Sequence, residues 1–198
     1  KLGRIVTALA AGIPATLEVE VLGEIAEQEV AVLELSALKG LFTDLSDEPV
    51  SYVNAPLLAA EKGVQVSLSA SPDSPDFKNL VRVKGALADG SLVSVAGTLA
   101  GTRQREKIVE VNGFHVDVLL AAHIAFFTYV DRPGVVGYIG NVMGDAGINI
   151  AGMQVSRRGE GGEAMIILTV DEAIAAADVA SIIAGVGART GCTVDLVD

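Results

Sequence analysis

The order of hydrophobic periodicities in the C-terminal third constrains the fold of this chain most strongly. His123–Val130 and Ile148–Ser156 are apolar, strand-like runs, and a helical stripe with apolar residues every three or four positions lies between them. Two further strand-like runs, Ala164–Val170 and Cys192–Val197, flank a second helical stripe over 176–188. The order strand, helix, strand, strand, helix, strand is typical of the ferredoxin-like split unit. The C-terminal part is therefore predicted to form a βαββαβ domain.

Local signals set the turns of this domain. Pro133 is predicted at the first helical position, where its missing N–H has no cost, and Gly147 is predicted to end that helix. Arg157–Gly162 reads as a charged, glycine-rich turn between two strands. The run Gly185–Gly191 does not have the spacing or the strand-to-helix setting of a dinucleotide-binding loop, so a helix C-cap is favoured there.

The residues upstream have a different pattern, with helices first and alternating strands afterwards. Asn112-Gly113 lies between two alternating runs and predicts a two-residue hairpin loop, since type I′ turns need two residues with φ > 0. We expect helices over 1–10, 28–45 and 54–62, and strands over 16–21, 64–69, 80–87, 92–99, 107–111 and 114–118. The fold class is therefore α+β, with an antiparallel α+β domain over 1–120 and the βαββαβ domain over 123–198.

Composition excludes some partners. The 198 residues include 25 acidic and 14 basic side chains, a net charge of −11 that opposes binding to nucleic acid or to an anionic membrane surface. One cysteine cannot form an internal disulfide, which indicates a cytoplasmic protein. The first ten residues read as the middle of an amphipathic helix without an N-cap, so we expect the chain to be cut from a longer polypeptide.

A short segment after the first strand of the βαββαβ domain has the chemistry to bind a free amino acid. Tyr129 and Asp131 are two residues apart on one strand face, roughly 6–7 Å along it. Asp131 supplies an anion for an ammonium group, and the helix start at Gly134–Val136 supplies N–H donors for a carboxylate. Asn149 supplies an amide that can reach a ligand held by a neighbouring subunit. The alternative is that Asp131 is an ordinary polar residue before a helix and Asn149 a turn residue.

Longer motifs carry a family resemblance. The segment from Asp131-Arg-Pro-Gly to Gly140, followed by Gly147-Ile-Asn-Ile-Ala-Gly, resembles the ACT domain of D-3-phosphoglycerate dehydrogenases. Ser51-Tyr-Val-Asn-Ala-Pro and Val109-Glu-Val-Asn-Gly113 resemble the intervening domain of the long form of that family. The resemblance covers nearly the whole chain.

The resemblance implies a regulatory part of an NAD-dependent enzyme of L-serine biosynthesis. It implies that L-serine is the effector, that the chain's other partners are the catalytic domains of its parent, and that paired ACT domains form a homo-oligomer. It places the NAD cofactor and all catalytic residues outside this chain. The residues it assigns to the serine site are Tyr129, Asp131, Gly134, Val135, Asn149 and Ile150. Many family members have His and Asn where this chain has Tyr129 and Asp131, which leaves the effector's affinity and identity open.

A second site is predicted upstream. Arg103, Arg105 and Lys107 alternate, so on a strand they share one face that suits a phosphate. Lys107 lies where the resemblance implies an anion ligand in the intervening domain. The alternative is a solvated edge strand that charge protects from aggregation.

Other functions stay open. The ACT pair can serve only to assemble subunits, or the chain can regulate another enzyme such as a serine dehydratase. His115 and His123 have no ligand-spaced partners, so we expect no metal site. Cys192 lies in an apolar strand, where a small core residue is favoured over a nucleophile.

Overall fold

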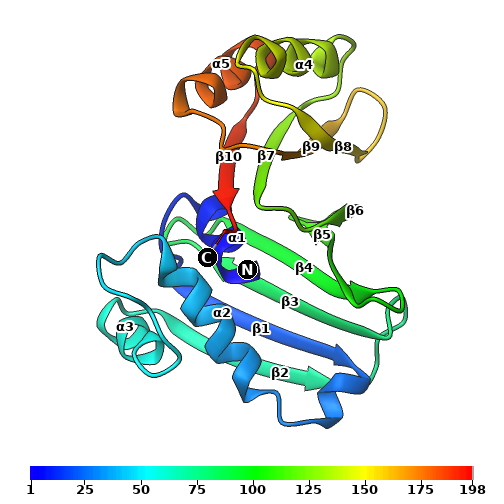
Figure 1. Cartoon of the computed structure of the whole chain (residues 1–198). Coiled ribbons are helices and arrows are strands. Elements are labelled where there is room, and N and C mark those ends of the chain that lie inside the picture. The colour runs from blue at the N-terminus through cyan, green and yellow to red at the C-terminus, as the bar shows by residue number, and fades with distance from the viewer. Residues whose placement is uncertain (198) are drawn as a thin grey trace. The chain divides into compact units, whose positions relative to one another are not determined.

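The computed structural model describes residues 1–197 and divides the chain into two compact units. The first unit covers Lys1–Gly113 and the second begins at Phe114, so the division falls at the end of the Asn112-Gly113 turn. Figure 1 shows both units, and each is described by itself below. Within residues 1–197, no helix combines the length and the apolar composition that crossing a membrane requires.

The first unit contains three α-helices, a short 3-10 helix and most of a six-stranded sheet. Its helices are α1 (Leu2–Ala10), α2 (Ala31–Thr43) and α3 (Ala55–Glu61), with the 3-10 turn at Glu24–Glu27. The strands of its sheet are β1 (Thr16–Gly23), β2 (Gln65–Ser71), β3 (Asn79–Ala86), β4 (Leu92–Ala100), β5 (Arg105–Val111) and β6 (Phe114–Leu119). The predicted elements are all present, with shifts of a few residues at their ends.

The strand order in this sheet is β2-β1-β3-β4-β5-β6. The β1–β3, β3–β4 and β4–β5 pairs are antiparallel, in agreement with the predicted antiparallel domain. The β1–β2 pair is parallel, because the chain between these strands crosses back through α2 and α3. The hairpin loop is confirmed, since Asn112 and Gly113 both have positive φ, at 47° and 77°.

The two faces of β1 differ in chemistry. Leu17, Val19 and Val21 are fully buried, and α2 packs on this strand (Figure 1). Glu18 and Glu20 alternate with them and lie on the opposite face. The helices therefore cover one face of the sheet, and charged side chains lie on the other.

The α1–α2 contact depends on close approach of two helices. An ideal Cβ on Gly3 would lie 2.1 Å from the Ala37 carbonyl oxygen, so no larger residue fits there. Beside it, Thr7 Oγ1 donates to the Leu41 carbonyl oxygen at 2.7 Å. The Arg4 guanidinium pairs with both oxygens of Asp44, at 2.9 and 2.8 Å. These contacts hold the two helices in one register.

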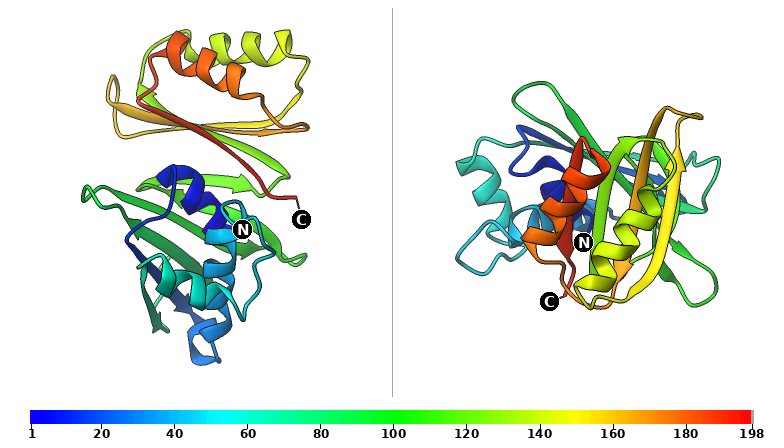
Figure 2. Two further views of the ribbon diagram at one scale, coloured as in Figure 1. Left: turned by 90° about the vertical axis from the view of Figure 1, so that its left-hand side faces the viewer. Right: turned by 90° about the horizontal axis from the view of Figure 1, so that it is seen from above.

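The second unit has the predicted βαββαβ order after β6. The elements are β7 (His123–Val130), α4 (Val135–Asp145), β8 (Ile150–Arg157), β9 (Glu163–Val170), α5 (Ala176–Val186) and β10 (Thr190–Asp195). The strand order is β10-β7-β9-β8, and all neighbouring strands are antiparallel. Figure 2 shows α4 and α5 side by side on one face of this sheet. The predicted fold class is confirmed, while the exact domain bounds of 1–120 and 123–198 stay a prediction.

One core lies between this sheet and its two helices. Alternate residues of the central strands β7 and β9 point into it, and α4 and α5 close it. Its strand and helix members include Phe127, Tyr129, Ile166, Leu168, Ile139, Met143 and Ile182, all of them at most 1% exposed. The C-cap of α5 is Gly187, with φ 66°, which confirms the predicted role of the glycine-rich run. Tyr129 is thus a core residue at one end of the sheet.

Candidate functional site

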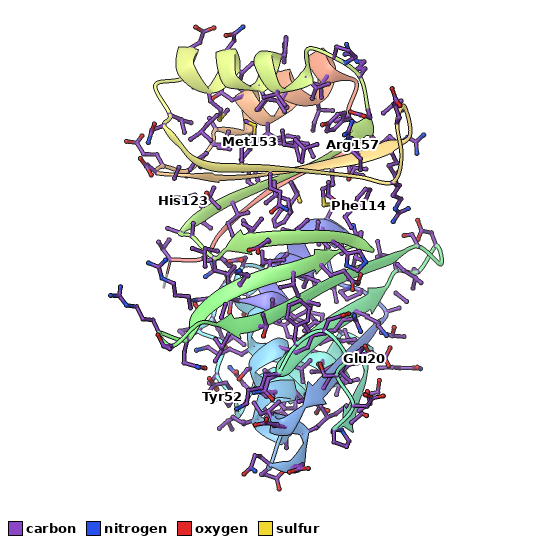
Figure 3. The ribbon with its side chains drawn as sticks, turned by 90° about the vertical axis from the view of Figure 1, so that its right-hand side faces the viewer. Glu20, Tyr52, Phe114, His123, Met153 and Arg157 are labelled. Carbon is purple, nitrogen blue, oxygen red and sulfur yellow. The ribbon has the colours of Figure 1, made fainter. Side chains whose placement is uncertain are left out.

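The last residues of β7 and of β8 lie at the same end of the four-stranded sheet. Tyr129 pairs in register with Ala164 of β9, and Ala164 pairs in turn with Arg157 of β8. Ala164 is fully buried and its methyl group is small, so it leaves room above the central strand. Figure 3 labels Arg157 at the end of β8, beyond Met153 on the same strand. A long side chain at residue 157 can therefore reach across β9 toward the end of β7.

Asp131 is the hydrogen-bond partner of the Arg157 side chain. Its carboxylate oxygen Oδ2 accepts a hydrogen bond from Arg157 Nη1 at 3.2 Å. Its backbone N–H donates to the Gly162 carbonyl oxygen at 2.8 Å, which fixes the start of the β7–α4 loop to the β8–β9 turn. The Asp131 side chain is 18% exposed and that of Arg157 is 58% exposed. Asp131 is therefore a held, partly covered anion, as an ammonium site requires.

Tyr129 lies beneath this pair. Burial raises the pKa of the Tyr129 hydroxyl, and the negative charge of Asp131 raises it further, while the charge of Arg157 acts in the opposite sense. The phenol therefore stays protonated at neutral pH and presents a neutral donor and acceptor.

The first turn of α4 completes this end of the sheet. The helix begins at Val135, and Gly134 is its N-cap with φ 92°. The prediction that Pro133 is the first helical residue is wrong, because the left-handed Gly134 separates the proline from the helix. Tyr138 N–H donates to the Gly134 carbonyl oxygen at 2.9 Å, while the N–H groups before it have no partner within the helix. These donors suit a carboxylate.

Asn149 lies at the other end of the sheet. Ile150 pairs in register with Val170, at the opposite end of β8 from Arg157. The length of β8 separates Asn149 from the Asp131 end by about 25 Å. One copy of the domain therefore does not bring Asp131 and Asn149 together, and Gly134, Val135 and Ile150 divide between the two ends in the same way.

Asn149 also has a partner of its own. Its side-chain Nδ2 atom donates to Asp171 Oδ2 at 2.7 Å, and its backbone carbonyl oxygen accepts from the Asp171 backbone N–H at 3.2 Å. Asp171 directly follows β9. Sequence reasoning missed both Asp171 and Arg157 as neighbours of the candidate residues. The charged turn after Arg157 drew attention to the segment, but only the strand register shows which carboxylate the arginine reaches.

Two of the three residues of the predicted anion site lie on one strand. Arg105 and Lys107 lie on β5, opposite Ala100 and Thr98 of β4, whereas Arg103 lies in the turn before the strand. Glu106 alternates with the two basic residues and pairs with Lys1. The edge-strand interpretation is wrong, because β5 lies between β4 and β6 in the strand order.

The remaining candidates take structural positions. His123 Nδ1 lies 2.7 Å from Asp195 Oδ1, which links the outer strand β10 to β7. His115 is exposed on β6. Burial raises the pKa of the Cys192 thiol to about 12, so this group is not a thiolate nucleophile at neutral pH. Among the described residues, no three His, Cys, Asp or Glu side chains group to hold a metal ion.

Comparison with known proteins joins these two units to one family. The family model of the D-3-phosphoglycerate dehydrogenase intervening domain matches residues 1–112, and the ACT domain model matches residues 123–184. The D-3-phosphoglycerate dehydrogenase of Mycobacterium leprae is 42% identical over 96% of this chain.

The chain belongs to the D-3-phosphoglycerate dehydrogenase family. The enzyme of Mycobacterium tuberculosis H37Rv is 44% identical over 87% of the chain, and that of Bacillus subtilis is 36% identical over 75%. The chain spans about a third of the length of these relatives: 36% of the M. leprae enzyme, 33% of the M. tuberculosis enzyme and 28% of the B. subtilis enzyme. It carries the intervening domain and the ACT domain of this family.

Proposed function

We propose that this chain is the regulatory part of a D-3-phosphoglycerate dehydrogenase and that its ACT domain senses L-serine. The observation that carries the proposal is the end of β7, where the Asp131 carboxylate faces Arg157 beside the first turn of α4. An anion and a set of N–H donors within one small region complement the ammonium and carboxylate groups of a free amino acid. The oxidation of 3-phosphoglycerate with NAD then belongs to other parts of such an enzyme, and this chain needs no cofactor of its own.

The proposed site needs two copies of the domain. Within the described residues, β8 has a strand neighbour on one side only, namely β9. A two-fold axis beside β8 would pair it with its copy in antiparallel fashion, because symmetric edge strands run in opposite directions. The Asn149 end of one copy then lies against the Arg157 end of the other. Two equal sites result, each with Asp131 from one copy and Asn149 from its partner.

Regulation follows from where the effector binds. A ligand that bridges two copies binds only the paired arrangement well, so it shifts the population toward that arrangement. The paired arrangement then restrains the catalytic domains of the parent. Because such coupling is reciprocal, substrate binding would weaken or strengthen serine binding by the same factor.

Calorimetric titration with L-serine, with glycine and L-alanine as controls, tests the proposal. We expect saturable binding of serine and its loss in Asp131→Asn, which removes the charge but keeps the shape. The matched control is Asp76→Asn, the same substitution at an exposed loop residue of the first unit. Retained serine binding in Asp131→Asn would contradict the site assignment.

A second candidate function is supported by one observation. Both Asp131 and Asn149 already have partners inside their own domain, as a module that only assembles subunits would require. Sedimentation of the Asp131→Ala, Asn149→Ala double variant separates the two. If the chain only assembles subunits, this variant keeps the oligomeric state of the wild type. The wild type itself then binds no amino acid.

The basic pair on β5 is proposed as a phosphate contact of the intervening domain. Arg105 and Lys107 alternate on one strand and have the charge for it. Titration with inorganic phosphate should show binding that the double variant Arg105→Gln, Lys107→Gln loses. Unchanged binding in that variant would reject this contact.

A further inference from the structure

The two side chains that a bridging amino acid needs are each held by a charged neighbour. Arg157 donates to the carboxylate of Asp131 at 3.2 Å, and the carboxylate of Asp171 accepts from the amide of Asn149 at 2.7 Å. A guanidinium thus occupies the place that suits an ammonium group. A carboxylate likewise occupies the place that suits the carboxylate of an amino acid.

We propose that Arg157 and Asp171 are resident counter-groups and that the effector binds by exchange with them. The ammonium group of the amino acid replaces Arg157 at Asp131, and its carboxylate replaces Asp171 at Asn149. This inference rests on the proposed function and adds to it the residues that set affinity and ligand class. No bond is made or broken in the exchange, and each charge is replaced by one of the same sign.

Exposure decides which partner leaves. The Arg157 side chain is 58% exposed, whereas the Asp131 side chain is 18% exposed. The Arg157 side chain can rotate away into solvent at little cost in free energy. Asp131 is confined, because its backbone N–H is hydrogen-bonded to the Gly162 carbonyl oxygen. Asn149 and Asp171 are both exposed, so this pair also opens easily. The exchange therefore frees the binding groups and leaves the displaced ones solvated.

The strength of the resident pairs sets the effect on affinity. An exposed ion pair contributes little free energy, so removing one that competes with the ligand should tighten ligand binding by about 1.4-fold to 5-fold.

The exchange also predicts how the affinity depends on salt. Salt weakens the resident pair and the incoming pair alike, so wild-type affinity should change little with ionic strength. Without Arg157, a new ion pair forms and none is lost, so the affinity should fall as salt rises.

The ligand class follows from the two separate exchanges. Ethanolamine carries the ammonium and hydroxyl groups of serine without its carboxylate, so it can displace Arg157 but has nothing to replace Asp171. Removing the charge of Asp171 should therefore change serine binding and leave ethanolamine binding unchanged. Removing the charge of Arg157 should change both.

The test is calorimetric titration of the full chain with L-serine and with ethanolamine, at low salt and at about 0.5 M salt, where screening is strong. For Arg157→Gln we expect about 1.4-fold to 5-fold tighter binding of both probes at low salt, and this gain should be lost at high salt. For Asp171→Asn we expect tighter serine binding only. The matched control is Arg189→Gln, which makes the same change of charge in the same unit but pairs with Glu163 at 3.1 Å. It should titrate as the wild type.

The other outcomes are distinct. Weaker serine binding in Arg157→Gln would show that the arginine is a direct ligand of the effector and would overturn the exchange, while the proposed function stands. Equal affinity and an equal salt profile in the wild type and Arg157→Gln would also overturn it. If no folded variant and no wild-type sample binds serine, the proposed function fails, and the exchange fails with it.

Discussion

The two units each contain an arginine that reaches a carboxylate across an alanine. In the first unit, Arg82 of β3 pairs in register with Ala96 of β4, and Ala96 with Glu110 of β5. The guanidinium spans the small alanine and pairs with Glu110 on one side and Glu20 on the other, both at 2.9 Å. In the second unit, Arg157 spans Ala164 to reach Asp131.

The two arrangements differ in where the arginine stands. Arg82 is in an inner strand, and its side chain is 23% exposed, beside Glu20 at 19% and Glu110 at 18%. Arg157 is at the end of an outer strand of its sheet and is 58% exposed. A network held on all sides stabilises the fold, because none of its members can leave without an unpaired charge remaining. A pair with one solvated partner is weak and open to exchange. Position in the sheet, more than residue type, separates the inner network from the weakly held outer pair.

The largest expected effect comes from breaking the inner network. Arg82→Ala should lower the free energy of unfolding of the first unit by about 2 kcal/mol, since it leaves Glu20 and Glu110 partly buried with less compensation. Urea denaturation followed by circular dichroism measures this. Arg105→Ala, on the exposed part of β5, is the control and should change the stability little. A loss below about 0.5 kcal/mol in Arg82→Ala would remove the contrast between the units.

A smaller effect is expected from Glu20 and depends on pH. Burial by itself raises the pKa of Glu20, but hydrogen bonds from Lys84 and Arg82 and the charges of both outweigh it, so the pKa lies below its ordinary value of 4.5. The unfolded chain then takes up the proton first as pH falls. The stability that Glu20 contributes is present above pH 4.5 and is lost as the pH falls through the lowered value.

Glu20→Gln should therefore cost about 1 kcal/mol at neutral pH and flatten the fall of stability with acid. Urea midpoints measured across the acid range test this, with Glu61→Gln, at the exposed last residue of α3, as the control. An unchanged acid slope in Glu20→Gln would place the acid sensitivity elsewhere.

The smallest effect is expected at the outer pair. Arg157→Gln should change the stability of the second unit by less than about 0.5 kcal/mol, and salt should remove even this difference. Cys192 offers a local readout, because it is the single cysteine and burial raises its pKa to about 12. Cys192 is partly covered and its thiol stays protonated at neutral pH, so labelling by a thiol reagent should become faster if β10 opens more often. Equal labelling rates in wild type and Arg157→Gln are expected. Faster labelling would show that Arg157 holds the fold.

Much of the architecture was predictable because its determinants are local. The period of the apolar residues distinguishes helix from strand, and glycines with positive φ at 113, 147 and 187 mark turns that other residues adopt with strain. One local error concerns Pro133, since a proline just before an apolar stripe is equally compatible with the first helical turn and with the loop ahead of it. The parallel β1–β2 pair was not predictable, because alternation shows which residues share a face but not the direction of the neighbouring strand.

In the candidate site, too, the locally encoded features were predictable and the contacts between distant segments were not. The sequence alone determined the βαββαβ order, the helix that begins after Asp131, and the presence of an anion and an amide suited to an amino acid. Only the tertiary structure decided that Asp131 faces Arg157, that Asn149 faces Asp171, and that the two candidate residues lie at opposite ends of one sheet. The reason is physical: residue types and their period act over a few positions, whereas strand order and register bring together groups that are 26 or 22 positions apart in the chain.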